Sequence, residues 1–118
     1  MNKWPKSVVS SGKKYQVRYI KTKTDNGGLG QTHYAKKRVL VSTVNDGSPV
    51  QPAEMFEYFL HECGHTIFLD NRMLRNVIRD GCGGDDDAVE SWHEQFFVTL
   101  SDFLLRNGIV TLPDGRPK

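Results

Sequence analysis

Residues 56–70 read FEYFLHECGHTIFLD, and the middle of this stretch, residues 61–65, is HECGH. Apolar side chains flank the motif on both sides, as in a helix that packs against a core. Residues four apart lie about 40° apart around a helix, so His61 and His65 point the same way and can bind one ion. The alternative is that they are ordinary polar residues on a helix face.

Zinc suits this pattern because it binds histidine nitrogens and prefers four ligands. His61, His65 and one further protein ligand leave the fourth position to water. Glu62 lies one step round the helix from His61, where it can reach that water and take its proton. Gly64 costs about 1 kcal/mol relative to alanine in mid-helix, and we expect it to leave room beside the metal. The motif therefore predicts a Zn²⁺ site with Glu62 as general base.

The third ligand must come from elsewhere in the fold, and the last predicted helix offers Glu90, His93 and Glu94. On a helical wheel, His93 falls inside the apolar arc, Glu90 at its edge beside Phe97, and Glu94 about 40° further out. A carboxylate beside an apolar stripe needs a partner such as a cation. Glu94, one turn on, could orient a zinc-bound histidine. We rank Glu90 first, Glu94 second and His93 third. The predicted apolar arc comprises Val89, Trp92, Phe96, Leu100, Phe103 and Leu104.

The second half of the chain has a helical pattern throughout. Pro52 suits the first turn of a helix over residues 52–69, where its missing N–H costs little. Residues 73–79 predict a short helical piece, and the acidic run at 85–87 can cap a long helix over 88–107. The last ten residues are expected to form a tail with a short strand.

The first half favours strands. Residues 14–21 alternate, with Tyr15, Val17 and Tyr19 on one face. Residues 24–30 form a glycine-rich turn, and the β-branched run at 38–44 is the best strand. We expect an α+β fold with an antiparallel sheet of about three strands. It would be a single domain: β-rich over 1–50, helical over 51–108 and a tail over 109–118.

Composition limits the other possibilities. The 118 residues suit one domain, and the apolar runs are too short to span a membrane. The N-terminus lacks a signal-peptide core, so we expect the protein in the cytosol, with Cys63 and Cys82 as free thiols. Residues 1–50 hold ten basic side chains against two acidic ones. The basic half suggests a solvated face or, alternatively, a nucleic-acid partner.

With these motifs the sequence resembles the minimal zincins with a glutamate ligand, the gluzincins, including the ImmA/IrrE and SprT-like metallopeptidases. It is most similar to small proteins of bacteriophages, over about residues 7–108. The resemblance implies His61, His65 and Glu90 as zinc ligands and Glu62 as general base. Cys63 within the motif departs from the usual pattern, and His93 keeps the third ligand open. Candidates for an oxyanion donor are Tyr34, His33 and His93.

These features lead to three hypotheses. The first is a zinc metallopeptidase that holds a peptide or protein substrate along an edge strand, here assigned to residues 38–44. The second is a zinc-binding phage virion or accessory protein that cleaves nothing and binds other phage proteins. The third is a protease acting at nucleic acid, by analogy with the SprT-like group.

Overall fold

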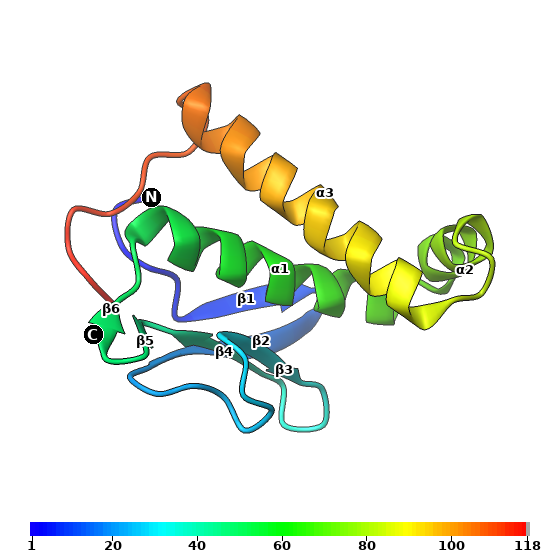
Figure 1. Ribbon diagram of the computed structural model, residues 1–118, viewed down its shortest axis with the longest axis horizontal. Coiled ribbons are helices and arrows are strands. Elements are labelled where there is room, and N and C mark those ends of the chain that lie inside the picture. Colours follow the sequence, from blue (N-terminus) through cyan, green and yellow to red (C-terminus); the bar gives the residue numbers. More distant parts are fainter. Residues whose placement is uncertain (118) are drawn as a thin grey trace.

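The fold, given by a computed structural model that describes residues 1–117, is α+β and combines a mixed four-stranded sheet, a small two-stranded sheet and three helices (Figure 1). The strands are β1 (Ser7–Ser10), β2 (Lys13–Ile20), β3 (Gly30–His33), β4 (Arg38–Ser42), β5 (Val44–Asn45) and β6 (Ser48–Pro49). The helices are α1 (Pro52–Asp70), α2 (Arg72–Gly81) and α3 (Asp86–Arg106).

The main sheet has the order β1-β2-β4-β3. β1 and β3 pair antiparallel with their neighbours, whereas β2 and β4 run parallel, with Val17 opposite Val39. The α+β class is as predicted, and two of the three strand pairings are antiparallel as expected. The sheet differs from the prediction in having four strands rather than about three and in its one parallel pair, β2 with β4. The chain leaves β2, crosses to the far edge as β3, and turns back through a short hairpin into β4. β4 then fills the place between them and runs in the same direction as β2.

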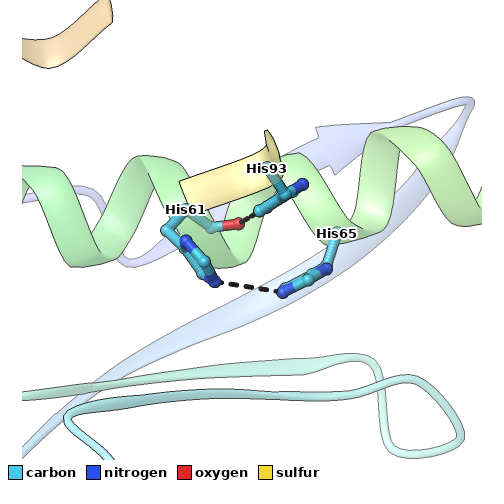
Figure 2. A group of neighbouring side chains, drawn as sticks. All are labelled: His61, His65 and His93. Carbon is cyan, nitrogen blue, oxygen red and sulfur yellow. Dashed lines mark hydrogen bonds between the residues drawn. The ribbon is translucent and has the colours of Figure 1, made fainter. Parts of the chain in front are cut away.

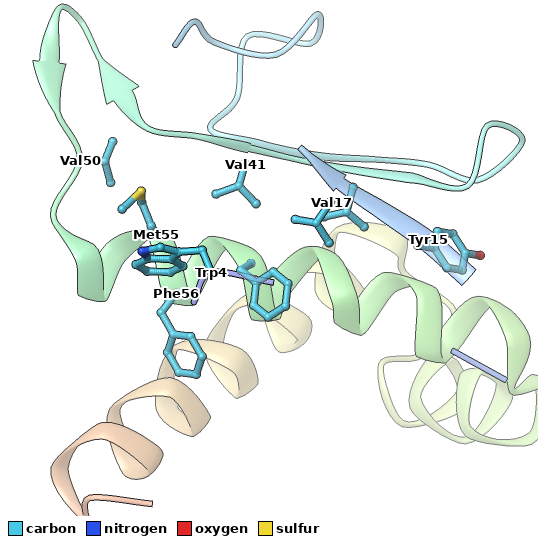
Figure 3. Packing of buried hydrophobic residues seen from close by; sticks show 9 residues of the cluster. Trp4, Tyr15, Val17, Val41, Val50, Met55 and Phe56 are labelled. Carbon is cyan, nitrogen blue, oxygen red and sulfur yellow. The ribbon is translucent and has the colours of Figure 1, made fainter. Parts of the chain in front are cut away.

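The main core lies between this sheet and α1 (Figure 3). Tyr15 and Val17 of β2 face it, as the alternation predicts, and Val39 and Val41 of β4 are fully buried. Met55 on the first turns of α1 is fully buried as well. Burying each large apolar side chain contributes about 1.5–3 kcal/mol, so this layer fixes α1, and with it residues 61–65, on the sheet.

The three helices match the regions expected to be helical, and their ends follow the local sequence. Pro52 begins α1, the Asn71 side chain caps α2 by accepting from the Leu74 N–H, and the Asp85 carboxylate caps α3 by accepting from the Asp87 N–H. Residues 109–117 form no strand, contrary to expectation. Instead they return towards the N-terminus, where the Trp4 indole N–H donates to the Gly115 carbonyl at 2.8 Å.

The buried face of α3 differs from the predicted arc. His93, Phe97 and Ser101 are its buried residues, whereas Phe96 and Phe103 are 45% and 56% exposed. The apolar arc of this helix is broad, and the position of α1 decides which part of it is covered.

Gly64 fixes the place where α3 crosses α1. A Cβ at Gly64 would lie 2.3 Å from the Phe97 ring and 2.8 Å from Cε1 of His93. The space left by this glycine is thus filled by α3, which corrects the expectation that it serves the metal. Within residues 1–117, no helix combines the length and apolar character needed to cross a membrane.

Candidate metal centre

Three histidines gather where α1 meets α3 (Figure 2). His61 and His65 lie one turn apart on α1, and His93 projects from α3. Each offers a ring nitrogen, and these nitrogens all lie within 4.8 Å of one another. This arrangement could hold a metal ion.

The orientations of the rings distinguish the three histidines. The Nε2 atoms of His61 and His65 are 3.2 Å apart, and the two rings are nearly perpendicular, at 82°. His93 instead stacks on His65, with centroids 4.0 Å apart and planes 6° apart. A histidine nitrogen directs its lone pair in the plane of its ring, so two stacked parallel rings do not aim at one point. The Nε2 of His93 also lies 2.7 Å from the His61 carbonyl oxygen, to which it donates as N–H (Figure 2).

Glu90 brings an oxygen to the open side of the histidine pair. Its Oε1 lies 3.1 Å from His61 Nε2 and 3.7 Å from His65 Nε2. Four ligands at about 2.05 Å from a tetrahedral zinc ion are about 3.3 Å from one another. The three separations, 3.1, 3.2 and 3.7 Å, bracket this value. His61, His65 and Glu90 thus fit a tetrahedral ion in both distance and donor type.

Glu62 lies beside this set but is turned towards the sheet. Its Oε1 accepts a hydrogen bond from the Thr32 hydroxyl at 2.9 Å, and its Oε2 lies 3.9 Å from His61 Nε2. Only 7% of Glu62 is exposed. Burial raises the pKa of its carboxyl to about 7, assisted by the negative charge of Glu90 and opposed by the bond from Thr32. A carboxyl with a pKa near neutrality is suited to exchanging protons.

His65 is held in the neutral form that binds metals. Burial, together with the neighbouring charges of His93 and His61, lowers its pKa to about 3. Burial lowers the pKa of His93 in the same way. The cluster therefore needs no deprotonation of His65 at neutral pH before an ion can bind.

Glu94, the second-ranked ligand candidate, and the two cysteines lie outside the histidine cluster. Within residues 1–117, Glu94 forms no hydrogen bond or ion pair with a histidine, so the expected support of a zinc-bound histidine by Glu94 is not seen. It lines the cavity on the His61 side instead. Cys63 faces the core, and burial raises the pKa of its thiol to about 12. Both cysteines are free, as expected.

The cluster borders a polar cavity beside Glu62 and two further cavities on its His61 and His65 sides. One, of about 410 Å³, lies on the His61 side and includes Glu57, Glu90 and Glu94. The other, of about 180 Å³, lies on the His65 side between the three helices. Tyr34 borders the second, and of the three oxyanion-donor candidates only Tyr34 also faces the polar space beside Glu62. Burial, with the charge of Glu62 as the next cause, raises the pKa of the Tyr34 phenol.

Sequence reasoning missed two residues of β3 that shape this site. Thr32 binds Glu62 through its hydroxyl, and Gly30 packs so closely that a Cβ there would lie 2.8 Å from Glu62 Oε2. Both are about thirty positions from Glu62 in sequence, and no local pattern signals such a contact.

Comparison of the chain with protein-family models, curated proteins and solved structures gave no significant match.

Proposed function

We propose that this protein is a zinc-dependent metallopeptidase. The observation that carries the proposal is the convergence of His61 Nε2, His65 Nε2 and Glu90 Oε1, separated by 3.1–3.7 Å, with the carboxyl of Glu62 beside them. Two imidazoles and a carboxylate suit zinc. They leave one position free, as hydrolytic zinc sites require.

The reaction would be addition of water to a peptide carbonyl, followed by cleavage of the C–N bond. A zinc ion at this site would polarise the carbonyl and acidify the attacking water. Glu62 accepts the proton of that water and delivers it to the leaving amine. Thr32 holds the Glu62 carboxylate by one oxygen and leaves Oε2 free on the side of His61.

The substrate strand would lie along β3. Residues 38–44 were the expected edge, but β4 lies between β2 and β3 and has no free side. β3 is an edge strand, and its Gly30, Gln31 and Thr32 border the polar cavity that contains His61, Glu62 and His65. An extended peptide added to this edge would pass directly in front of the cluster.

Glu62→Gln tests the proposal. We expect the variant to bind zinc as the wild type does, while hydrolysis of a quenched fluorescent peptide library falls by about 10³-fold or more, because the proton acceptor is lost. Glu54→Gln is the matched control, since Glu54 lies on the first turn of the same helix. Equal hydrolysis by Glu62→Gln and wild type would refute the mechanism. Zinc binding without hydrolysis by the wild type would support a non-catalytic zinc protein instead.

A further inference from the structure

Side chains from all three helices line the cavity on the His65 side of the cluster. Phe68 comes from α1, Ile78 from α2, and Val89 and Trp92 from α3. All four are only partly buried, although they are large and apolar. His65 and Glu90 border the same cavity, so it opens directly onto the proposed metal ligands.

The size of this cavity and its mainly apolar lining suit one large apolar side chain, and its two charged lining residues, Arg75 and Glu90, are both exposed. Its volume is about 180 Å³, and an apolar cavity of about 150 Å³ is enough to hold benzene. The Phe68 and Trp92 rings meet edge to face, with centroids 5.6 Å apart, and form an aromatic wall. An aromatic or aliphatic side chain bound there would cover these two rings and remove their apolar surface from water, which favours binding.

The opposite side of the cluster does not suit such a side chain. The cavity there includes Glu57, Glu62, Glu90 and Glu94. Burying an apolar group against these carboxylates would remove water from charged groups without replacing its hydrogen bonds. The two sides of the cluster therefore differ in chemistry, and the apolar side chain belongs on the side of His65.

The direction of β3 decides which substrate residue reaches this cavity. Gly28 to Gly30, at the start of β3, border the acidic cavity, whereas Tyr34, just past its end, borders the aromatic one. Antiparallel pairing is the commoner arrangement and is slightly more stable per residue. A peptide antiparallel to β3 has its N-terminal part beside Tyr34 and its C-terminal part beside Gly28.

We propose that the aromatic cavity binds the side chain of the residue that supplies the scissile carbonyl, and that the preferred residue there is large and apolar. This rests on the proposed function. The substrates would be peptides with a phenylalanine or leucine on the N-terminal side of the cleaved bond.

Two matched peptides test the preference, one with phenylalanine and one with alanine before the cleaved bond. We expect kcat/KM to be about tenfold or more higher for the phenylalanine peptide, as apolar pockets typically discriminate. Ile78→Asp should abolish that difference and leave zinc content unchanged. Val77→Asp is the control, because Val77 is the neighbouring residue on α2, is 63% exposed and does not border the cavity. Equal rates for the two peptides, or a preference only after the cleaved bond, would overturn the proposal.

A binding measurement separates this proposal from the proposed function. N-acetyl-L-phenylalaninamide is titrated into metal-free protein, and the Trp92 indole N–H resonance is followed by NMR. We expect a saturable shift that N-acetyl-L-alaninamide does not produce and that Ile78→Asp removes. This result would support the cavity even if the protein hydrolyses nothing. Hydrolysis of peptides by a protein whose Trp92 resonance does not respond would refute the cavity and leave the peptidase activity standing.

Discussion

The hydroxyl of Thr32 sets the position of the Glu62 carboxylate. It donates to Glu62 Oε1 at 2.9 Å and also lies 3.1 Å from the Glu62 carbonyl oxygen. If Glu62 transfers protons as proposed, Thr32→Val should lower kcat by about 10-fold to 100-fold, because the carboxylate loses the bond that orients it. Thr32→Ser, which keeps the hydroxyl, should restore most of kcat. A Thr32→Val protein with wild-type kcat would remove this positioning role.

The pKa of Glu62 predicts a pH dependence of stability in the metal-free protein. The folded-state pKa, about 7, is raised above the ordinary 4.5, so the folded state binds this proton more tightly than the unfolded state. Stability is therefore lost as pH rises from 4.5 to 7, by about 3 kcal/mol in total. Glu62→Gln removes that loss, since glutamine stays neutral. We expect chelator-treated Glu62→Gln to exceed the wild type in free energy of unfolding at pH 8 and to match it near pH 4. A constant difference between pH 4 and pH 8, measured by urea unfolding, would contradict this assignment.

At the same scale, the sequence could predict some residues of the candidate site but not others. His61 and His65 share one helical face, so their proximity follows from spacing alone. The edge of an apolar stripe singled out Glu90 from the sequence, with His93 and Glu94 as alternatives. Only the placement of α3 against α1 reveals that Glu90 Oε1 lies 3.1 Å from His61 Nε2 and 3.7 Å from His65 Nε2. Thr32 and Gly30 could not be found, because their contact with Glu62 depends on how β3 packs against α1.

At the scale of the elements, the crossing of α1 and α3 leaves no room for a side chain at Gly64. Gly64→Ala would place a methyl group 2.3 Å from the Phe97 ring, so the helices would have to separate. Overpacking of this kind typically costs about 1–3 kcal/mol. Gly81→Ala, at the end of α2, is the control, since a Cβ there meets no atom within 4 Å. We expect urea unfolding to show a loss for Gly64→Ala and no loss for Gly81→Ala. Equal stabilities of Gly64→Ala and the wild type would contradict the close approach of the two helices at Gly64.

Helix positions could be predicted because their signals are local. Proline, the capping aspartate and the apolar period all lie within each helix or next to it. The pairing of the strands could not be predicted, because β2 and β4 become neighbours only when β3 lies at the edge of the sheet. The buried face of α3 could not be predicted either. Ser101 is buried and Phe103 is exposed, which is the reverse of what hydrophobicity alone suggests.

On the scale of the whole molecule, metal binding and stability should be linked. The proposed ligands come from α1 and α3, so an ion would join the two helices and stabilise only the folded state. Zinc at about 1,000 times its dissociation constant would add about 4 kcal/mol. We expect a chelator to lower the melting temperature, and His61→Ala to remove the effect of zinc. His33→Ala is the control, since His33 lies on β3 outside the cluster. A melting temperature that zinc and chelators leave unchanged would rule out a structural link through the metal.

The insertion of β4 between β2 and β3 has a consequence for the order in which the chain assembles. Val39 pairs with Thr32, seven residues earlier, and with Val17, twenty-two residues earlier. Closing the shorter loop costs less entropy, so the β3–β4 hairpin should form first and β2 should add to it later. Lys37, at the turn, has a φ of 50°, which favours glycine. Lys37→Gly should therefore speed refolding more than it slows unfolding in stopped-flow experiments. The kinetic φ-value of this turn, the share of the stability change that appears in the folding rate, should then be high.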